Sequence, residues 1–198
     1  MNCRRTNTSY TAFWLVLFSL LSASGYAAEL NDEQIELRSF LEHTIATASS
    51  FDDRFSAEVW LVDMDNRLSR FIKDPEERMT ILKHVHREAN QSQLQPDLVL
   101  ALIEVESHFD RYAISRVGAQ GLMQIMPFWK EEIGRSDDNL TNIETNVRYG
   151  CRILQFYLQK EKGNMSKALA RYNGSVGKTW YSERVMDAWQ ARWLAGNL

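Results

Sequence analysis

Two glutamates, Glu104 and Glu106, interrupt a stretch over 96–108 that is apolar on nearly every side. Such a stretch predicts a buried central helix. Because each helical residue turns the chain by about 100°, the two carboxyls point about 200° apart and cannot act as a pair. Glu106 instead shares its face with Val99 and Leu102, close to the expected end of the helix.

This position predicts an unusual carboxyl at Glu106. Desolvation on an apolar face disfavours the anion, and so does the negative end of the helix dipole, so both effects raise the pKa. A carboxyl that stays protonated near neutral pH can protonate a glycosidic oxygen. The same spacing also suits a structural ion pair with Lys or Arg across a helix interface, and spacing alone favours that second interpretation.

The segment after this helix, 113–127, contains two glycines three residues apart and ends at Pro127. It lacks a helical period, so we expect an irregular loop with a small hairpin, folded back against the helix. Such a loop would bring Ser115 and Gln124, two neutral hydrogen-bonding side chains, beside Glu106. Neutral donors and acceptors around one acid suit the recognition of sugar hydroxyl and acetamido groups. The alternative is a packed turn whose glycines only permit a positive φ.

Four motifs follow one another along the chain. They are Glu-Ser at 106–107, Gly-Ala-Gln-Gly-Leu-Met-Gln-Ile-Met-Pro at 118–127, Asn-Ile followed by Asn and Tyr-Gly between 142 and 150, and Ala-Leu-Ala-Arg-Tyr-Asn-Gly at 168–174. Taken together, this ordered set resembles the catalytic domain of the soluble lytic transglycosylases, the family-1 enzymes related to goose-type lysozyme. The resemblance covers about residues 80–185.

The resemblance implies a mainly α fold, a lysozyme-like helical domain with a small irregular or hairpin segment, whose partner is the glycan strand of peptidoglycan. It implies that Glu106 is the sole catalytic acid and base and that Tyr172 hydrogen-bonds to it. The implied reaction breaks the β-1,4 bond between N-acetylmuramic acid and N-acetylglucosamine without water and leaves 1,6-anhydro ends. The implied substrate-binding residues are Ser115, Gln124, Met126, Tyr172 and Asn173.

Two other functions fit parts of the pattern. Asp110 lies four residues after Glu106, and on a continued helix it would supply the second carboxylate of a hydrolytic, lysozyme-like muramidase. A non-catalytic module that binds cell wall would keep the motifs without turnover. The chain departs from the family pattern at Arg171, where alanine is usual, and after Pro127. These departures affect the sugar subsites rather than the acid.

The remaining residues indicate neither a metal nor a cofactor. His84 and His86 are two positions apart on an expected helix, so they point apart and cannot chelate one ion as an i, i+4 pair does. The formal charge of −3 and the lack of a basic block argue against nucleic acid as a partner. Among the aromatic residues, we expect Trp189 and Trp193 in the core; Trp129, Trp180 and Tyr181 fit either the core or a groove wall.

The first 27 residues are typical of a secretory signal peptide, with a basic start, a short apolar run and a small-x-small end. Cleavage near Ala27 would remove Arg4 and Arg5 and no acid, which takes the formal charge from −3 to −5. It would also remove Cys3 and leave Cys151 as a single, buried cysteine. We therefore expect an exported, periplasmic protein, for which peripheral association with the cell envelope stays open and protein partners are unknown.

After the signal peptide we expect an N-terminal helical extension over 28–75 and a lysozyme-like domain over 76–198. Hydrophobic periodicity, caps and prolines predict the individual helices. Their expected ranges are 31–47, 54–73, 75–90, 96–108, 127–133, 141–162, 166–173 and 183–193.

Overall fold

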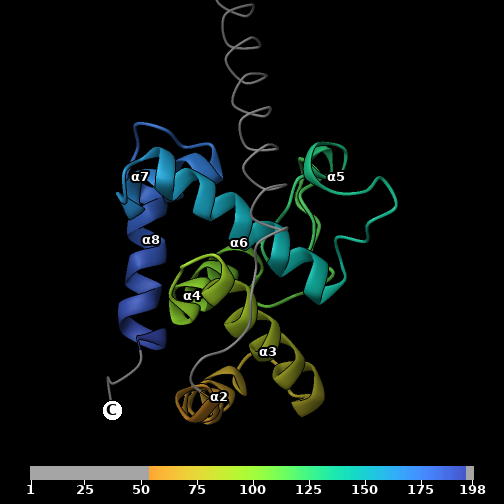
Figure 1. Cartoon of the computed structure of the whole chain (residues 1–198), viewed down its shortest axis with the longest axis vertical. Helices are drawn as coiled ribbons and strands as arrows, with labels where there is room; N and C mark the ends of the chain where they lie inside the picture. Colours follow the sequence, from red (N-terminus) through yellow and green to blue (C-terminus); the bar gives the residue numbers. More distant parts are fainter. Residues whose placement is uncertain (1–53, 195–198) are drawn as a thin grey trace, which may run out of the picture. The chain divides into compact units, whose positions relative to one another are not determined.

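Helix α4 (Pro96–Ser107) lies among the other helices in the computed structural model (Figure 1). Every residue over 97–104 is buried, as the apolar stretch predicts. The helix packs against α3 (Pro75–Gln91), α8 (Trp180–Ala188) and a π-helical segment, η1 (Trp189–Trp193). The element that carries Glu104 and Glu106 is therefore held by segments from both ends of the described chain.

The structure describes residues 54–194, and the rest of its regular structure is also helical. The remaining elements are α2 (Arg54–Leu68), α5 (Phe128–Ile133), α6 (Ile143–Lys160) and α7 (Met165–Asn173). No strand is formed within 54–194, so the predicted mainly α class is confirmed. The predicted signal peptide and the predicted helix over 31–47 lie outside the described residues. In this part of the chain no helix is both long enough and apolar enough to span a bilayer.

Local capping sets where two of these helices begin. The Asp74 carboxylate accepts a hydrogen bond from the backbone N–H of Glu76 at 2.9 Å, which caps α3 as predicted. For α6 the sequence predicted a capping box that begins at Thr141. The N-cap is instead Asn142, whose side chain accepts from the backbone N–H of Thr145 at 3.0 Å. The predicted start was therefore wrong by one residue.

The last helix also differs from its prediction. It begins at Trp180 rather than Glu183, because Tyr181, Val185 and Ala188 are all buried and extend the apolar face one turn upstream. It then widens into the π-helical segment η1, where Trp193 is fully buried. The expectation that Trp193 belongs to the core is confirmed.

The segment over 110–127 is irregular, as predicted, and contains two isolated antiparallel bridges rather than a full hairpin. Ile114 pairs with Gln120, and Gln120 pairs in turn with Ile125. Gly121 sits between these bridges with φ of 75°, a conformation that favours glycine. A Cβ there would lie 2.3 Å from the carbonyl oxygen of Leu140 and 2.5 Å from Nδ2 of Asn146 in α6, so this loop can approach α6 closely only with glycine at this position.

Helix α2 contributes to the same core as the helices that follow it. Met64 and Leu68 of α2 are fully buried in one cluster with Ile81 and Leu82 of α3. Beyond α2, the Phe71 ring lies with its centroid 5.9 Å from that of Trp193. The described helices on the two sides of residue 75, α2 and α3, pack together. The domain boundary near residue 75 stays a prediction.

Candidate active site

Glu106 lies in the last turn of α4, where its side chain is half-buried. Burial raises the pKa of its carboxyl from 4.5 to about 7, because the anion loses solvation there. A hydrogen bond from Tyr181 and the charge of Arg184 both act in the opposite direction, but they offset only part of the effect. The carboxyl is therefore poised to gain or lose a proton near neutral pH.

Tyr181, in the first turn of α8, is the residue that contacts this carboxyl. Its hydroxyl donates a hydrogen bond to Glu106 Oε1, and its ring is almost fully buried. Burial, together with the charge of Glu106, raises the pKa of the Tyr181 phenol well above its usual value. The phenol therefore stays a donor, and its single hydrogen points to the acid. The sequence left Tyr181 open between core and groove wall and did not predict this contact.

Tyr172, near the end of α7, does not make the hydrogen bond that was expected of it. Its hydroxyl donates to the backbone carbonyl of Met123 at 2.8 Å. Burial raises the pKa of Tyr172, and the charge of Glu106 raises it further. The two side chains therefore interact electrostatically without a direct hydrogen bond. The predicted partner of the acid was the wrong tyrosine, because the way α8 packs on α4 brings Tyr181 closer.

The loop over 110–127 is tied to α4 directly beside the acid. The Ser107 hydroxyl lies 2.8 Å from the carbonyl oxygen of Leu122 and 3.3 Å from that of Ile103. It thus bridges the loop to its own helix. In the Glu-Ser motif, the glutamate faces the site and the serine holds the loop that follows.

Asn146 of α6 fixes the same loop from the other side. This side chain is 1% exposed and makes three hydrogen bonds. Its Oδ1 accepts from the backbone N–H of Met123 at 2.7 Å, and its Nδ2 donates to the carbonyls of Gln120 and Leu140, each at 2.8 Å. Buried polar groups need hydrogen-bond partners, and the Asn146 amide finds all of its partners in the backbone of this region. Asn146 therefore fixes the position of the loop relative to α6. The sequence analysis placed Asn146 in a motif but predicted no role for it.

The two neutral side chains predicted beside Glu106 brace the loop from within. Ser115 Oγ accepts from the backbone N–H of Ala119 at 3.0 Å. Gln124, which has a positive φ of 50°, donates through Nε2 to the carbonyls of Gly121 at 2.9 Å and Ala113 at 3.2 Å. Among the described residues neither side chain hydrogen-bonds to Glu106. These bonds leave the Ser115 hydroxyl hydrogen and the Gln124 side-chain oxygen available to a ligand.

The other predicted binding residues lie at the surface or close to it. Met126 is half-buried against the core, and Asn173 is exposed as the last residue of α7. Trp180, which the sequence also left open, is 52% exposed. Its ring meets the Tyr181 ring edge-on, with centroids 5.7 Å apart. An exposed aromatic face thus adjoins the phenol that contacts the acid, and such a face can stack on a sugar.

Glu104 and Asp110 occupy different environments from Glu106. Glu104 is buried, pairs with Arg192 at 2.7 Å and accepts from the Trp193 indole N–H at 2.6 Å. The structural ion pair that the sequence analysis considered for Glu106 is thus made by Glu104 instead. Asp110 is exposed and accepts from the backbone N–H of Tyr112 at 2.8 Å, in a turn that begins where α4 ends.

The helix ends abruptly because the two residues after Ser107 turn left-handed. His108 has φ of 51° and Phe109 has φ of 65°. Asp110 therefore leaves the helical face of Glu106, and no second carboxyl contributes to the pKa shift of that residue. Residues 54–194 also contain no group of three His, Cys, Asp or Glu side chains that could hold a metal ion. The site thus centres on one carboxyl with a phenolic donor.

Comparison with known proteins identifies the family of this chain. The family model described as the transglycosylase SLT domain matches residues 83–190. The chain is 31% identical over 105 residues to membrane-bound lytic murein transglycosylase F of Desulfosudis oleivorans, which covers 51% of this chain and 23% of that protein. It is 32% identical over 88 residues to the transglycosylase of Enterobacteria phage PRD1, which covers 44% of this chain and 32% of that protein.

Among solved structures, an inactive mutant of the lytic transglycosylase Slt from Pseudomonas aeruginosa is 30% identical, with a TM-score of 0.45. That match covers 50% of this chain and 17% of the other. The chain spans less than a third of the length of the curated relatives that it matches.

Proposed function

Because the chain belongs to the transglycosylase SLT family, we propose that it is a lytic transglycosylase of peptidoglycan. It would cleave the β-1,4 bond between N-acetylmuramic acid and N-acetylglucosamine without water and leave 1,6-anhydro-muramoyl ends. The observation that carries this proposal is the single half-buried carboxyl of Glu106, whose pKa lies at about 7 beside the Tyr181 hydroxyl. The described helices agree with the lysozyme-like fold that the sequence resemblance implied.

In the first step Glu106 acts as the acid. Its proton passes to the glycosidic oxygen, the bond between C1 of the muramic acid and that oxygen breaks, and the N-acetylglucosamine leaves with a free hydroxyl. The positive charge that develops at C1 is held by the neighbouring acetamido group or as an oxocarbenium ion. A carboxyl that is still largely protonated at neutral pH is suited to this step.

In the second step the same residue acts as the base. The Glu106 carboxylate removes the proton of the muramic acid 6-hydroxyl, and that oxygen bonds to C1 to close the 1,6-anhydro ring. The carboxyl is protonated again, no water is consumed, and the atoms balance. During the interval between the steps the anion is stabilised by the Tyr181 hydrogen bond and the charge of Arg184. A pKa near 7 favours both halves of this cycle at neutral pH.

We assign the sugar contacts to the neutral side chains that the sequence motifs identify. Ser115 and Gln124 offer a hydroxyl and an amide oxygen from a loop that is fixed by its own hydrogen bonds. Asn173 presents an exposed amide and Met126 an apolar surface, as the sequence motifs predict. Tyr172 supports the site indirectly, because its hydroxyl holds the carbonyl of Met123.

Digestion of purified sacculi tests the reaction. Mass spectrometry of the products separates anhydro ends, which this proposal expects, from the reducing ends of a hydrolytic muramidase; intact sacculi would indicate a binding module. Glu106→Gln keeps the shape of the side chain but cannot act as an acid, so release of anhydro-muropeptides should fall by about 100-fold or more. Glu131→Gln, at an exposed position on α5, is the matched control and should leave the release unchanged. Undiminished release by Glu106→Gln would exclude the assignment.

We also propose the location and organisation that the sequence predicts: a signal peptide over 1–27, a helical extension over 28–75 and the transglycosylase domain over 76–198. The basic, apolar and small-residue order of the first 27 residues supports export to the periplasm. Intact-mass measurement of the protein from a periplasmic fraction tests this. A mass that includes the first 27 residues would contradict cleavage.

A further inference from the structure

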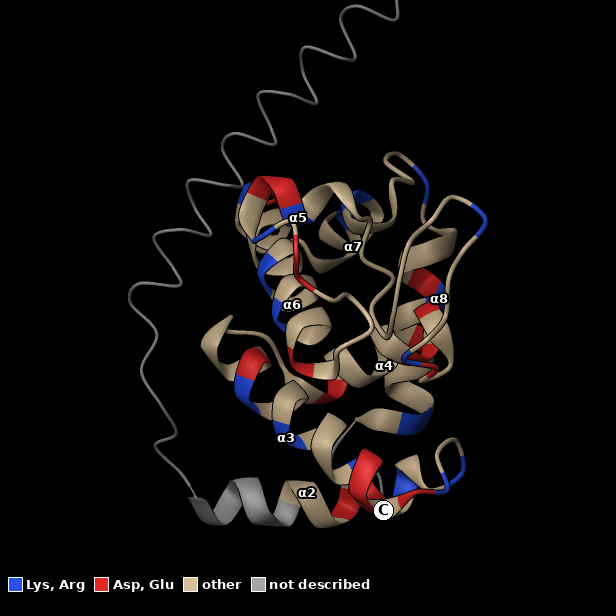
Figure 2. Ribbon diagram, turned by 90° about the vertical axis from the view of Figure 1, so that its right-hand side faces the viewer, with Lys and Arg blue, Asp and Glu red and all other residues tan. Residues whose placement is uncertain are grey.

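The segment over 160–178 is strongly basic in a chain that is acidic overall. Five of its side chains are cationic and one is acidic, which gives a formal charge of +4 against −3 for the whole chain. The sequence shows no basic block because these cations are spread singly among other residues. In the folded chain, several of them come together on α7 and the connection that follows it; Figure 2 shows basic positions there.

A pocket with a volume of about 450 Å³ lies where α7 meets the connection over 174–179 and the end of α6. Its cationic side chains are Lys167, Arg171 and Lys178, and its acid is Glu161. We call it the cationic pocket. Arg171 and Glu161 form an ion pair with each other, so they neutralise one another. The charge of the pocket then rests on the two lysines.

Glu161 also interacts electrostatically with Lys167, but its ion pair is with Arg171. Lys167 and Lys178 are both exposed, and their ammonium groups make no hydrogen bond and no ion pair with residues 54–194. An exposed ammonium keeps its full charge and can meet an anion with little desolvation cost. Arg171 Nε donates to Glu161, so this cation already has a carboxylate partner and the lysines are the cations left to a ligand. The pocket therefore suits single carboxylates on a flexible chain.

The cationic pocket adjoins the proposed active site along the chain. The connection over 174–179 that lines it joins the end of α7, with Tyr172 and Asn173, to the start of α8, with Trp180 and Tyr181. Tyr181 contacts the acid directly. Arg171, which immediately precedes Tyr172, also departs from the family pattern noted in the sequence. The residues that line this pocket are thus continuous in the chain with residues on both sides of the proposed site.

We propose that the cationic pocket binds a carboxylate of the peptide stems carried by the glycan strand, so that the protein prefers strands that bear stems. This rests on the proposed function, because the strand must lie at Glu106. The sugars of the strand are neutral once the muramic acid carboxyl is amide-linked to its peptide, whereas the peptide has free carboxylates. The two exposed lysines thus distinguish strands by their peptide stems rather than by their sugars.

Two substrates test this: glycan strands with their stems, and the same strands after an amidase has removed the stems. The ratio of kcat/KM for anhydro-end formation on the two strands should exceed one for the wild type at low salt. It should fall as ionic strength rises, because exposed charges are screened. Lys178→Glu should lower the ratio by about threefold to tenfold, the range expected when an exposed ion pair is lost and a repulsion added. Lys167→Glu should act in the same direction.

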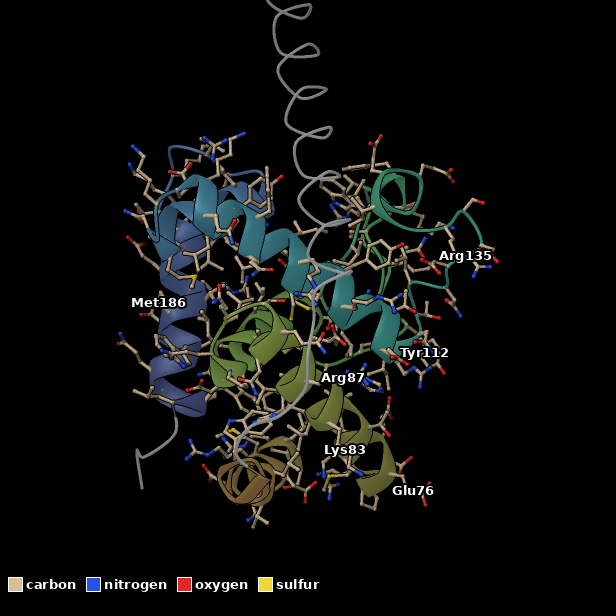
Figure 3. All side chains as sticks on the ribbon, in the orientation of Figure 1. Glu76, Lys83, Arg87, Tyr112, Arg135 and Met186 are labelled. Atoms are coloured by element: carbon tan, nitrogen blue, oxygen red, sulfur yellow. The ribbon has the colours of Figure 1, made fainter. Side chains whose placement is uncertain are left out.

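Lys83→Glu is the matched control, since Lys83 is also exposed but lies on α3, away from α7 (Figure 3). It reverses the same charge and should leave the ratio unchanged. Equal wild-type rates on the two strands, or an equal loss on both strands in Lys178→Glu, would overturn the proposal. Absence of anhydro ends from both kinds of strand would instead contradict the proposed function.

Two competition experiments identify the anion that the pocket binds. A third experiment measures binding without cleavage. Free stem peptide should inhibit cleavage of stem-bearing strands, whereas the same peptide with amidated carboxyls should not. Inorganic phosphate at matched ionic strength should inhibit no more than chloride does; stronger inhibition by phosphate would replace the carboxylate with a phosphate ligand and overturn this assignment. Co-sedimentation with the two kinds of strand should show the same order of preference, and equal binding to both would count against the pocket.

Discussion

Replacing Tyr181 with phenylalanine isolates the hydrogen bond that tunes the acid. The change keeps the buried ring and removes only the hydroxyl that donates to Glu106. A hydrogen bond to a charged group contributes about 1.5–3 kcal/mol, and one pKa unit corresponds to about 1.4 kcal/mol. The bond stabilises the anion, so its loss should raise the pKa of Glu106 above its present value of about 7 by about one to two units.

The dependence of kcat/KM on pH reports this shift, because it follows the essential acid of the free enzyme. Glu106 must be protonated to start the reaction, so wild-type activity should decline as pH rises through about 7. At a pH about 1.5 units above the pKa, only about 3% of the acid remains protonated. In Tyr181→Phe the decline should move to higher pH, so that the variant loses less of its own maximum at pH 8.5 than the wild type does.

Tyr112→Phe serves as the control for this comparison. Tyr112 is 64% exposed and lies away from α8 (Figure 3). Tyr112→Phe should therefore keep the wild-type pH profile. The position of the decline matters, rather than the maximal rate, since removing a group next to the acid also perturbs its orientation. If Tyr181→Phe declines at the same pH as the wild type or at a lower one, the hydrogen bond does not stabilise the anion and the reasoning fails.

Three further changes test the acid and the loop beside it. A folded-state pKa of about 7 against 4.5 means that Glu106 favours folding below pH 4.5 and that this contribution disappears as pH rises through 7. Thermal unfolding should therefore show Glu106→Gln more stable than the wild type by up to about 3 kcal/mol at pH 8 and similar to it at pH 4; the reverse order would refute the pKa. Gly121→Ala should destabilise by about 2 kcal/mol or more, because its Cβ would meet the Leu140 carbonyl at 2.3 Å; an unchanged midpoint in urea would contradict the close approach. Asn146→Ala should cost about 3 kcal/mol or more, since three backbone groups lose their partner in two buried hydrogen bonds and one part-buried one; exchange of the Met123 amide hydrogen should quicken, and a protected amide would refute this.

Local sequence signals predicted the helices well because their causes are local. An Asp followed by a proline is a local signal for a helix start, and the structure shows the Asp74 cap at 2.9 Å. The periodicity of 96–108 separated Glu104 from Glu106 for the same reason, since two residues on one helix keep their angular difference in any fold. One of them became a buried partner of Arg192 and the other a half-buried carboxyl beside a phenol.

The choice between Tyr172 and Tyr181 depends on packing that no short stretch of sequence contains. The two tyrosines are nine positions apart on different helices, and Tyr181 is 75 positions from Glu106. Which hydroxyl reaches the acid depends on how α7 and α8 pack, and α8 lies directly against α4. The motif containing Tyr172 identified the right region, but the neighbouring carbonyl of Met123 takes its hydroxyl. The hydrogen bond that tunes the acid therefore comes from a residue outside the four motifs, which makes Tyr181 the first position at which to examine how this site sets its pKa.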